Sequence, residues 1–352
     1  MGTKGQHTLA EITTQPEAWA DALQAFEARQ DELKKSWACL RLQRVLFAGC
    51  GSTHYLSQTA AFLFQSLTGV PARACPSSEI VLFGSQIMPD PGRTLLVAIS
   101  RSGTTTETLN AVERFCRLGG QAVWTITCYP NSPLAQAADL VLPAQAAQEQ
   151  SVAQTRSFTS MLLLAQALTA ALAGDAAMLE RLRRLPGALN DLSGQLGDLP
   201  RQLGTNLDIE RIYFLGGGPL YGVANEAMLK TKEMSLTHAE AYHPLEFRHG
   251  PMSMVSEHTL VVGLLSDSGL AEELRVLAEM QQLGACILAL AEDGSVLTPW
   301  RPETVVELRS GLEEWERGLL YLPVLQRLAY HRALAKGLDP DRPNNLTAVV
   351  TL

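Results

Sequence analysis

Short apolar runs that alternate with amphipathic stretches dominate the first part of the chain. The runs over 45–48 and 95–99 contain only apolar residues, which is typical of strands buried on both faces of a parallel sheet. Further strands are predicted over 72–75, 121–128 and 140–142, and helices over about 52–67 and 105–118. This alternation predicts a doubly wound parallel sheet with helices on both faces.

Two helical segments flank this sheet. Apolar residues at helical spacing predict an amphipathic helical arm over 1–40. A Leu- and Ala-rich stretch over 151–199, broken near Gly174 and Pro186, predicts a pair of linking helices. We therefore expect a first domain over 41–150, a second domain over 200–335 and a C-terminal tail over 336–352 that lies over the active site.

The second domain repeats the first. At a constant offset, Arg44, Phe47, Gly49, Gly51, Ala60, Ala72 and Glu79 recur as Arg211, Phe214, Gly216, Gly218, Ala227, Ala239 and Glu246. One residue out of that register, Ser100-Arg101-Ser102-Gly103 recurs as Ser266-Asp267-Ser268-Gly269. A constant offset over a whole strand–helix–strand–helix unit indicates a duplicated domain. The predicted fold class is α/β, with two doubly wound parallel sheets in tandem, each a three-layer αβα unit of the flavodoxin type.

An anion site is predicted where the strand at 95–99 ends. Five hydroxyl residues fall within seven positions there: Ser100, Ser102, Thr104, Thr105 and Thr106. The N–H groups and helix dipole of such a loop attract phosphate, and capping a helix alone needs fewer hydroxyls.

The loop after the preceding strand, which contains Gly51, Ser52 and Thr53, is expected to share this anion site. A dinucleotide site is not favoured there, because the third glycine of that fingerprint is missing. In the second copy Asp267 replaces Arg101 and would repel phosphate, so we expect the site in the first copy only.

The second copy carries the candidates for proton transfer. Lys230 and Glu233 lie three residues apart on a predicted helix, where an ion pair would hold the carboxylate in place, so Glu233 is a candidate base. His249, in a loop before Gly-Pro, is a candidate acid or base near neutral pH. Each feature alone is more often a solvated ion pair or a structural histidine. Their concentration in the copy without the anion site suggests that one copy binds phosphate and the other reacts.

Composition narrows the classes of partner. Hydrophobic residues make up 46% of the chain, charged residues 18%, and the net charge is -8, which argues against nucleic-acid binding. Six scattered cysteines without metal-ligand spacing predict reduced thiols and no metal site. The N-terminus lacks the apolar core of a signal peptide, and no apolar stretch of membrane-spanning length is free of charge. We expect a cytoplasmic protein that binds neither membrane nor cofactor.

Five ordered signatures resemble the double sugar-isomerase (SIS) domain family, in particular the isomerase half of the glucosamine-6-phosphate synthases. They are AGCGST, ISRSGTT, SVAQTRSFT, MLKTKEMSLTHAEAY with EFRHGP, and GLDPDRPNNL. By this resemblance the sugar phosphate would be held by Thr53, Ser100, Arg101, Ser102 and Thr105, with Val152 near the sugar.

The resemblance also assigns the reacting groups. Glu233 would move a proton between sugar carbons one and two, Lys230 would assist it, and His249 would open the ring. In that family the histidine loop reaches a neighbouring subunit's site, which implies a homodimer with shared active sites.

The sequence departs from those synthases in three places. A helical arm, and no glutaminase domain, precedes the first SIS domain, so we expect no glutaminase activity. Ala348 stands where the synthases carry a Schiff-base lysine in the tail, and Gln154 stands where a small hydroxyl residue is common. We therefore expect a phosphosugar isomerase or deaminase that acts on an amino or N-substituted sugar 6-phosphate, of the glucosamine-6-phosphate or fructose-6-phosphate type. The alternatives are a fructosamine-6-phosphate deglycase, a plain aldose–ketose isomerase and a non-catalytic phosphosugar sensor.

Overall fold

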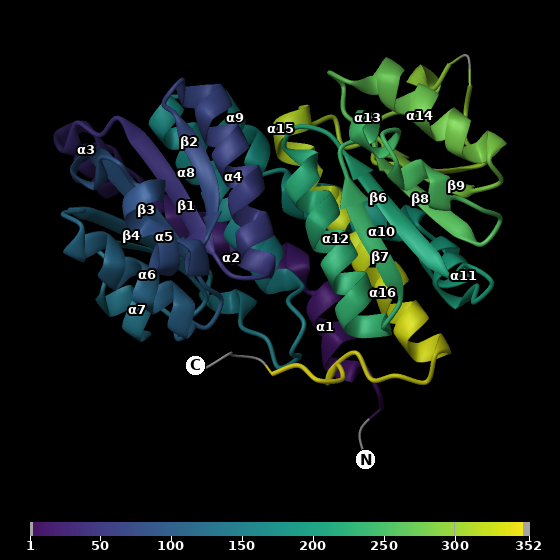
Figure 1. Ribbon diagram of the computed structural model, residues 1–352, viewed down its shortest axis with the longest axis horizontal. Helices are drawn as coiled ribbons and strands as arrows, with labels where there is room; N and C mark the ends of the chain where they lie inside the picture. Colours follow the sequence, from purple (N-terminus) through teal and green to yellow (C-terminus); the bar gives the residue numbers. More distant parts are fainter. Residues whose placement is uncertain (1–2, 299, 348–352) are drawn as a thin grey trace. The chain divides into compact units, whose positions relative to one another are not determined.

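The computed structural model describes residues 3–298 and 300–347, which form two compact units (Figure 1). Unit A comprises residues 13–149 and 154–186 together with residue 347. Unit B comprises residues 187–346, without residue 299, together with residues 3–12 and 150–153. Each unit is built around one parallel five-stranded sheet.

The sheet of unit A has the strand order β2-β1-β3-β4-β5, in which every pair is parallel. Its central strands are apolar and buried on both faces, which confirms the doubly wound sheet predicted from the sequence. The strands are β1 (Arg44–Gly49), β2 (Ala72–Pro76), β3 (Thr94–Ile99), β4 (Ala122–Thr127) and β5 (Leu140–Pro143).

Helices cover both faces of this sheet. On one face, Phe47 packs edge-on against Phe64 of α4, and Trp37 of α3 contacts Phe64 and Trp124. On the other face, Leu46, Leu96 and Val123 form a core with α5 and α6. The helices of unit A are α2 (Gln15–Glu27), α3 (Gln30–Leu40), α4 (Ser52–Thr68), α5 (Ser77–Ile87), α6 (Thr106–Arg117), α7 (Pro133–Gln136), α8 (Arg156–Ala173) and α9 (Ala176–Leu182).

The helix α8 differs from the linking helix predicted for this stretch. It packs against α2 and α4 and is buried along nearly its whole length, so it is a core helix of unit A. By length and composition α8 is the one helix of the described chain that passes the test for a membrane span, and 83% of it is buried inside the protein. A buried core helix accounts for that result.

The sheet of unit B repeats this topology. Its order is β10-β9-β8-β6-β7, so that β6 pairs with β7 and β8 as β1 pairs with β2 and β3. The strands are β6 (Arg211–Gly216), β7 (His238–Tyr242), β8 (Thr259–Leu264), β9 (Cys286–Ala291) and β10 (Thr304–Glu307). Two sheets with the same connections confirm the predicted tandem duplication.

Different helices cover the two faces of the second sheet. A Cβ on Gly216 would meet Leu220 and Ala224 of α12, whereas one on Gly217 would meet Glu273 of α14. The helices α12 and α14 therefore lie on opposite faces of the sheet (Figure 1). The helices of this unit are α1 (Gln6–Thr13), α10 (Leu185–Gln195), α11 (Leu199–Thr205), α12 (Leu220–Ser235), α13 (Pro244–Phe247), α14 (Leu270–Gln282), α15 (Glu314–Arg317) and α16 (Tyr321–Ala335).

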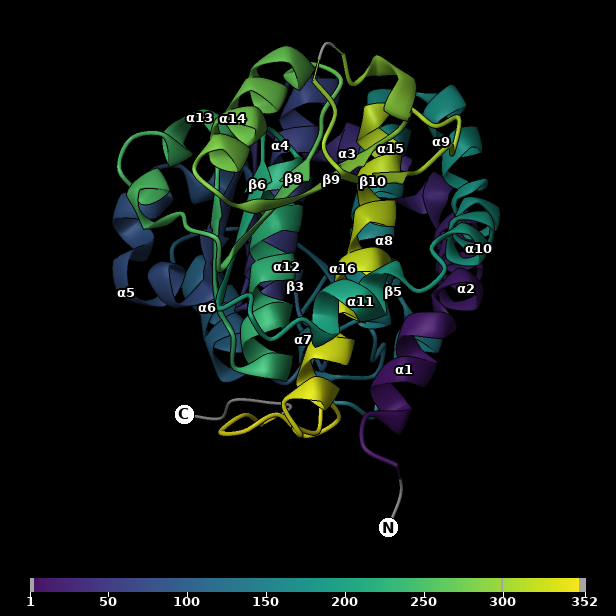
Figure 2. The ribbon, with the colours of Figure 1, turned by 90° about the vertical axis from the view of Figure 1, so that its right-hand side faces the viewer.

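The predicted N-terminal arm forms three helices, and the first of them belongs to unit B. The Asp341 carboxylate accepts the N–H groups of His7 (3.1 Å) and Thr8 (2.7 Å) and the Thr8 hydroxyl (2.7 Å). Asp339 accepts the N–H of Gly5 at 3.0 Å. The described part of the C-terminal tail thus caps the beginning of α1, and the two lie next to each other at the bottom of Figure 2. Ala348 lies outside the described residues.

Candidate active site

The hydroxyl-rich loop after β3 has a compact internal structure. Ser100 Oγ accepts the Gly103 N–H at 3.1 Å and lies 3.1 Å from Thr105 Oγ1, and Ser102 Oγ accepts the Thr104 N–H at 3.2 Å. Gly103 has a φ of +64°, and a Cβ there would lie 1.9 Å from Ser132 Oγ, so glycine is required. In the described part of the chain no protein group accepts the N–H of Ser102 or Thr105. Both donors point to an anion site.

The second loop predicted to bind phosphate lies at the same edge of the sheet. It follows β1, whose Ala48 pairs with Ala98 of β3, so the loops after β1 and β3 are neighbours. Gly51 has a φ of +54° and precedes α4 directly. Thr53 Oγ1 accepts the Cys50 N–H at 2.9 Å and donates to the Cys50 carbonyl at 3.0 Å. Gly51, Ser52 and Thr53 therefore lie beside the hydroxyl-rich loop, as the sequence predicted.

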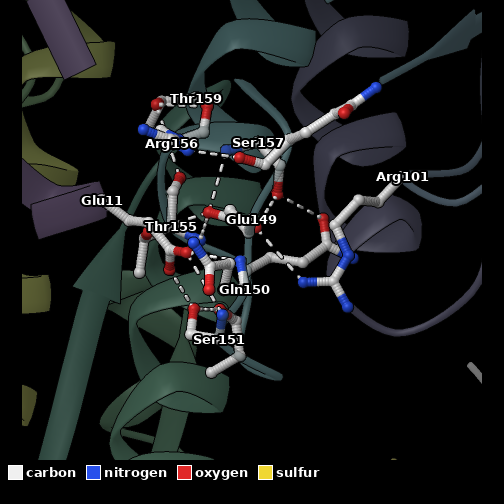
Figure 3. A network of polar contacts seen from close by, with 12 residues as sticks. Glu11, Arg101, Glu149, Gln150, Ser151, Thr155, Arg156, Ser157 and Thr159 are labelled. Atoms are coloured by element: carbon white, nitrogen blue, oxygen red, sulfur yellow. Dashed lines mark hydrogen bonds and ion pairs between the residues drawn. The ribbon is translucent and has the colours of Figure 1, made fainter. Parts of the chain in front are cut away.

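Arg101 is held by a buried glutamate that the sequence analysis did not single out. Its Nη1 donates to Glu149 Oε2 at 3.2 Å, and the Glu149 side chain is fully buried. Glu149 also accepts the N–H groups of Thr155 (2.7 Å) and Ser157 (3.1 Å) and both of their hydroxyls. Figure 3 shows these contacts converging on the Glu149 carboxylate. Glu149 neutralises Arg101 and at the same time caps the N-terminus of α8.

Val152 lies on the short segment 150–152. Hydrogen bonds to a carboxylate and to a backbone carbonyl of unit B hold this segment in place. Glu11 of α1, itself 3% exposed, accepts the N–H groups of Gln150 (2.6 Å) and Ser151 (3.2 Å) and the Ser151 hydroxyl. The Val152 N–H donates to the Asp341 carbonyl at 3.1 Å. Figure 3 shows Glu11 directed at this segment. The position of Val152 therefore depends on α1 and on the tail.

The ion pair predicted on α12 is present and is more buried than a surface pair. Lys230 is 1% exposed, and its ammonium donates to Glu233 Oε2. The Lys230 Nζ also lies 3.5 Å from Oε1 of Glu226, whose side chain is fully buried. Glu233 keeps 19% of its side chain exposed. Lys230 therefore lies between a buried carboxylate and one that solvent reaches.

Two cations fix the C-terminal end of α12. Lys336 Nζ donates to the carbonyls of Ser235 (3.0 Å) and Leu236 (3.3 Å) and to Thr237 Oγ1 (2.9 Å). Arg332 Nε donates to the same Thr237 hydroxyl at 2.7 Å. Burial first, and the Arg332 charge second, lower the pKa of Lys336. This helix end lies two residues beyond Glu233, so the cap limits the movement of the candidate base.

One chain does not bring His249 and Glu233 together. His249 is exposed in the turn after α13, and α13 packs through Phe247 on Tyr213 and Tyr242. These rings lie on the face of the sheet that α14 covers, whereas Glu233 belongs to α12 on the opposite face. The sheet of unit B therefore separates the two residues within a single chain. Among residues 3–298 and 300–347, no group of three or more His, Cys, Asp or Glu could hold a metal ion.

Comparison with known proteins finds relatives that match most of this chain. The chain is 32% identical over 322 residues to the glutamine–fructose-6-phosphate aminotransferase [isomerizing] of Pseudomonas putida, which covers 89% of this chain and 52% of that protein. The chain thus spans about half the length of the curated relatives it matches.

Two solved structures cover nearly the whole chain. The tagatose-6-phosphate ketose/aldose isomerase of Escherichia coli superimposes with a TM-score of 0.87 at 27% identity, over 97% of this chain and 96% of that one. The glucosamine-6-phosphate deaminase of Thermotoga maritima has a TM-score of 0.79 at 29% identity, over 99% and 100%. Both likenesses extend over both units.

The SIS domain family matches residues 41–171 and 207–329. The first match contains the sheet of unit A with most of α8, and the second contains the sheet of unit B with most of α16. The family resemblance predicted from the sequence is thereby confirmed: the chain consists of two SIS domains in tandem and belongs to the SIS domain family.

Proposed function

We propose that this protein is a phosphosugar isomerase or deaminase that acts on an amino or N-substituted sugar 6-phosphate. The observation that carries the proposal is the Lys230–Glu233 pair. Lys230 holds one oxygen of the Glu233 carboxylate, and within the described chain no protein group forms a hydrogen bond or ion pair with the other oxygen. A carboxylate that is fixed on one side and open on the other is suited to accept and return a proton.

In the proposed reaction Glu233 removes the proton from carbon two of the open-chain amino sugar and returns it to carbon one. The carbon that bears nitrogen becomes an imine, water adds to it, and ammonia leaves, so that a 2-keto sugar phosphate is formed. With an unaminated substrate the same proton shift gives aldose–ketose isomerisation. Lys230 holds the Glu233 carboxylate in its orientation before the transfer.

The phosphate of the substrate would bind at the loops of unit A. The free N–H groups of Ser102 and Thr105, with the hydroxyls of Ser100, Ser102 and Thr105, would supply donors to an oxyanion, and Thr53 fixes the neighbouring loop after β1. Arg101 adds a guanidinium that Glu149 holds in place. Val152 would contact the sugar.

The absence of a lysine at position 348 favours hydrolytic loss of nitrogen over imine formation with the protein. Ala348 cannot form a Schiff base, and Lys336, the lysine nearest to it in the sequence, caps α12 with its ammonium group. Water is then the nucleophile at carbon two. The similarity to a glucosamine-6-phosphate deaminase over the whole chain supports the same choice.

The test is product analysis in deuterated water. Glucosamine 6-phosphate, fructose 6-phosphate and an N-substituted fructosamine 6-phosphate are incubated with the protein, and NMR follows deuterium at carbon one while a coupled assay follows ammonia. Glu233→Gln is expected to lower turnover at least about 100-fold, whereas the control Glu257→Gln, at a side chain that is 81% exposed, leaves it unchanged.

Each alternative has its own signature in that experiment. Turnover without ammonia identifies a plain isomerase, and release of a substituted amine identifies a deglycase. Phosphosugars that raise the melting temperature but are not converted identify a sensor and refute the proposed catalysis. Equal activity of Glu233→Gln and wild type refutes the role of Glu233.

We further propose that the active sites are shared in a homodimer, with His249 opening the sugar ring at the site of a second copy. The support is the sheet that separates His249 from Glu233 within one chain. Mixing Glu233→Gln with His249→Asn under conditions of subunit exchange is expected to restore about one quarter of wild-type activity, because half of the dimers are mixed and each has one intact site. No recovery in verified mixed dimers would refute sharing.

A further inference from the structure

The duplicated loop of the second copy has kept the conformation of the first. Ser266 Oγ accepts the Gly269 N–H at 2.9 Å, as Ser100 Oγ accepts the Gly103 N–H at 3.1 Å. Each loop follows the middle strand of its sheet and leads into a helix, β8 into α14 and β3 into α6. The replacement of Arg101 by Asp267 has therefore not altered the fold of the loop.

A carboxylate from a distant part of the chain occupies the donors of this second loop. Oε2 of Glu314 accepts the N–H groups of Asp267 (3.0 Å) and Ser268 (3.3 Å) and the Ser268 hydroxyl (3.2 Å). Glu314 is 9% exposed and lies 47 residues beyond Asp267 in the chain. Three donors directed at one anionic oxygen form the arrangement with which a loop before a helix binds a phosphate oxygen.

The charged residue of each loop is paired, with opposite signs in the two copies. Arg101 pairs with Glu149, which follows β5, and Asp267 pairs with Arg317, which follows β10. The Arg317 Nη1 lies 2.7 Å from Asp267 Oδ2, and Arg317 is 3% exposed. The Asp267 carboxylate is therefore neutralised. Asp267 itself is therefore not what keeps phosphate out, contrary to the prediction from the sequence, because the carboxylate on the loop donors is that of Glu314.

We propose that Glu314 is a built-in anion that closes the second copy's loop and fastens α15 to it, so that each chain keeps one open phosphate loop. The chemical class that this loop accepts is a small oxyanion such as phosphate, and removal of the Glu314 carboxylate opens the loop to it. The buried Glu314 carboxylate already occupies the place of such a ligand. Glu273 closes the loop from a second side, since it accepts the Ser266 N–H and hydroxyl, both at 2.8 Å.

Hydrogen–deuterium exchange with inorganic phosphate as the probe tests this, because peptides report the two loops separately. In the wild type, the amides of Asp267 and Ser268 are expected to exchange slowly with or without phosphate. Those of Ser102 and Thr105 exchange fast and become slower as phosphate is added. In Glu314→Ala, the Asp267 and Ser268 amides are expected to exchange roughly tenfold faster and to slow again with phosphate.

The neighbour Glu313 gives a control of equal charge, since it is exposed and Glu313→Ala removes a carboxylate that holds no loop donor. Unchanged exchange at Asp267 and Ser268 in Glu314→Ala refutes the role of Glu314, and faster exchange that ignores phosphate refutes the latent anion site. If Glu314→Ala does not fold, Glu314→Gln keeps an acceptor without the charge and must still speed exchange at both amides. Failure of the Ser102 and Thr105 amides to respond to phosphate would instead count against the phosphate site of the proposed function.

Discussion

Replacing Lys230 by methionine tests whether the α12 ion pairs are a buried charge network. Lys230 is 1% exposed and its ammonium serves both Glu233 and the fully buried Glu226. Removing the cation takes away a positive charge that lies 3.5 Å from the buried Glu226 carboxylate, and removal of one partner of a buried ion pair costs about 3–5 kcal/mol in proteins. With a slope of about 2 kcal/mol/M, the urea midpoint of unit B is expected to fall by about 2 M.

The assay is urea unfolding followed by far-UV circular dichroism, with two comparisons. The surface control Arg183→Met removes pairs with Glu27 and Glu180 whose side chains are 45% and 70% exposed, and is expected to cost less than about 1 kcal/mol. The double variant Lys230→Met/Glu226→Gln removes both buried charges and is expected to recover at least about 1 kcal/mol. Its catalytic activity should nevertheless stay low, because Glu233 has lost its partner.

A midpoint for Lys230→Met within error of the wild type would refute the reasoning, since it would mean that the Glu226 carboxylate does not need this cation. A double variant no more stable than the single one would show that the cost comes from packing of the lysine stem and not from an uncompensated charge.

Three further expectations follow from the same structure. Gly103→Ala should destabilise the protein by several kcal/mol more than Gly69→Ala. Both glycines have a positive φ, but only a Cβ at position 103 would meet another atom, Ser132 Oγ at 1.9 Å. Equal melting temperatures of the two variants in thermal unfolding would contradict this. Burial raises the pKa of Glu273 to about 7 from an ordinary value of 4.5, so its contribution to stability is full below pH 4.5 and is lost as the pH rises through 7. The unfolding free energy of the wild type should therefore fall between pH 5 and 8, and Glu273→Gln should make this fall smaller by about 3 kcal/mol. An equal fall in the variant and the wild type would contradict the prediction. Lys336→Met should lower kcat more than it raises KM in steady-state kinetics, because the cap on α12 positions Glu233. The control is Lys232→Met, which changes an exposed lysine of the same helix, and an equal loss of kcat in this variant would argue against a specific role of Lys336.

The sheets, their duplication and the hydroxyl-rich loop after β3 could be predicted from the sequence because their signals are local. A parallel strand buried on both faces is an apolar run in the sequence, and Gly103 with its hydroxyl neighbours indicates the turn after β3. The pair of Lys230 with Glu233 is likewise visible as a spacing of three residues. Glu226 lies four residues before Lys230, and this spacing could have identified it too.

The carboxylates that organise the sites were not accessible in the same way. Glu11, Glu149 and Glu314 accept hydrogen bonds from residues that are 139, 48 and 47 positions away. Each lies in a stretch whose local pattern indicates an ordinary helix or loop, and only tertiary packing buries it. The contacts between α1, residues 150–152 and the tail could not be predicted for the same reason, since Glu11 and Asp341 join segments that are far apart in the sequence.

The comparison of the two loops shows which feature decides whether an anion can bind. Arg101 and Asp267 differ in sign, yet a buried partner of opposite charge neutralises each of them, Glu149 in one copy and Arg317 in the other. Neither side chain therefore brings an unbalanced charge to its loop. What differs is the state of the backbone donors: the Ser102 N–H has no protein acceptor in the described chain, whereas the Ser268 N–H is bonded to Glu314. If the proposal holds, the Glu314 carboxylate on α15, 47 residues beyond Asp267 in the chain, decides which copy of the duplicated loop stays open to an anion.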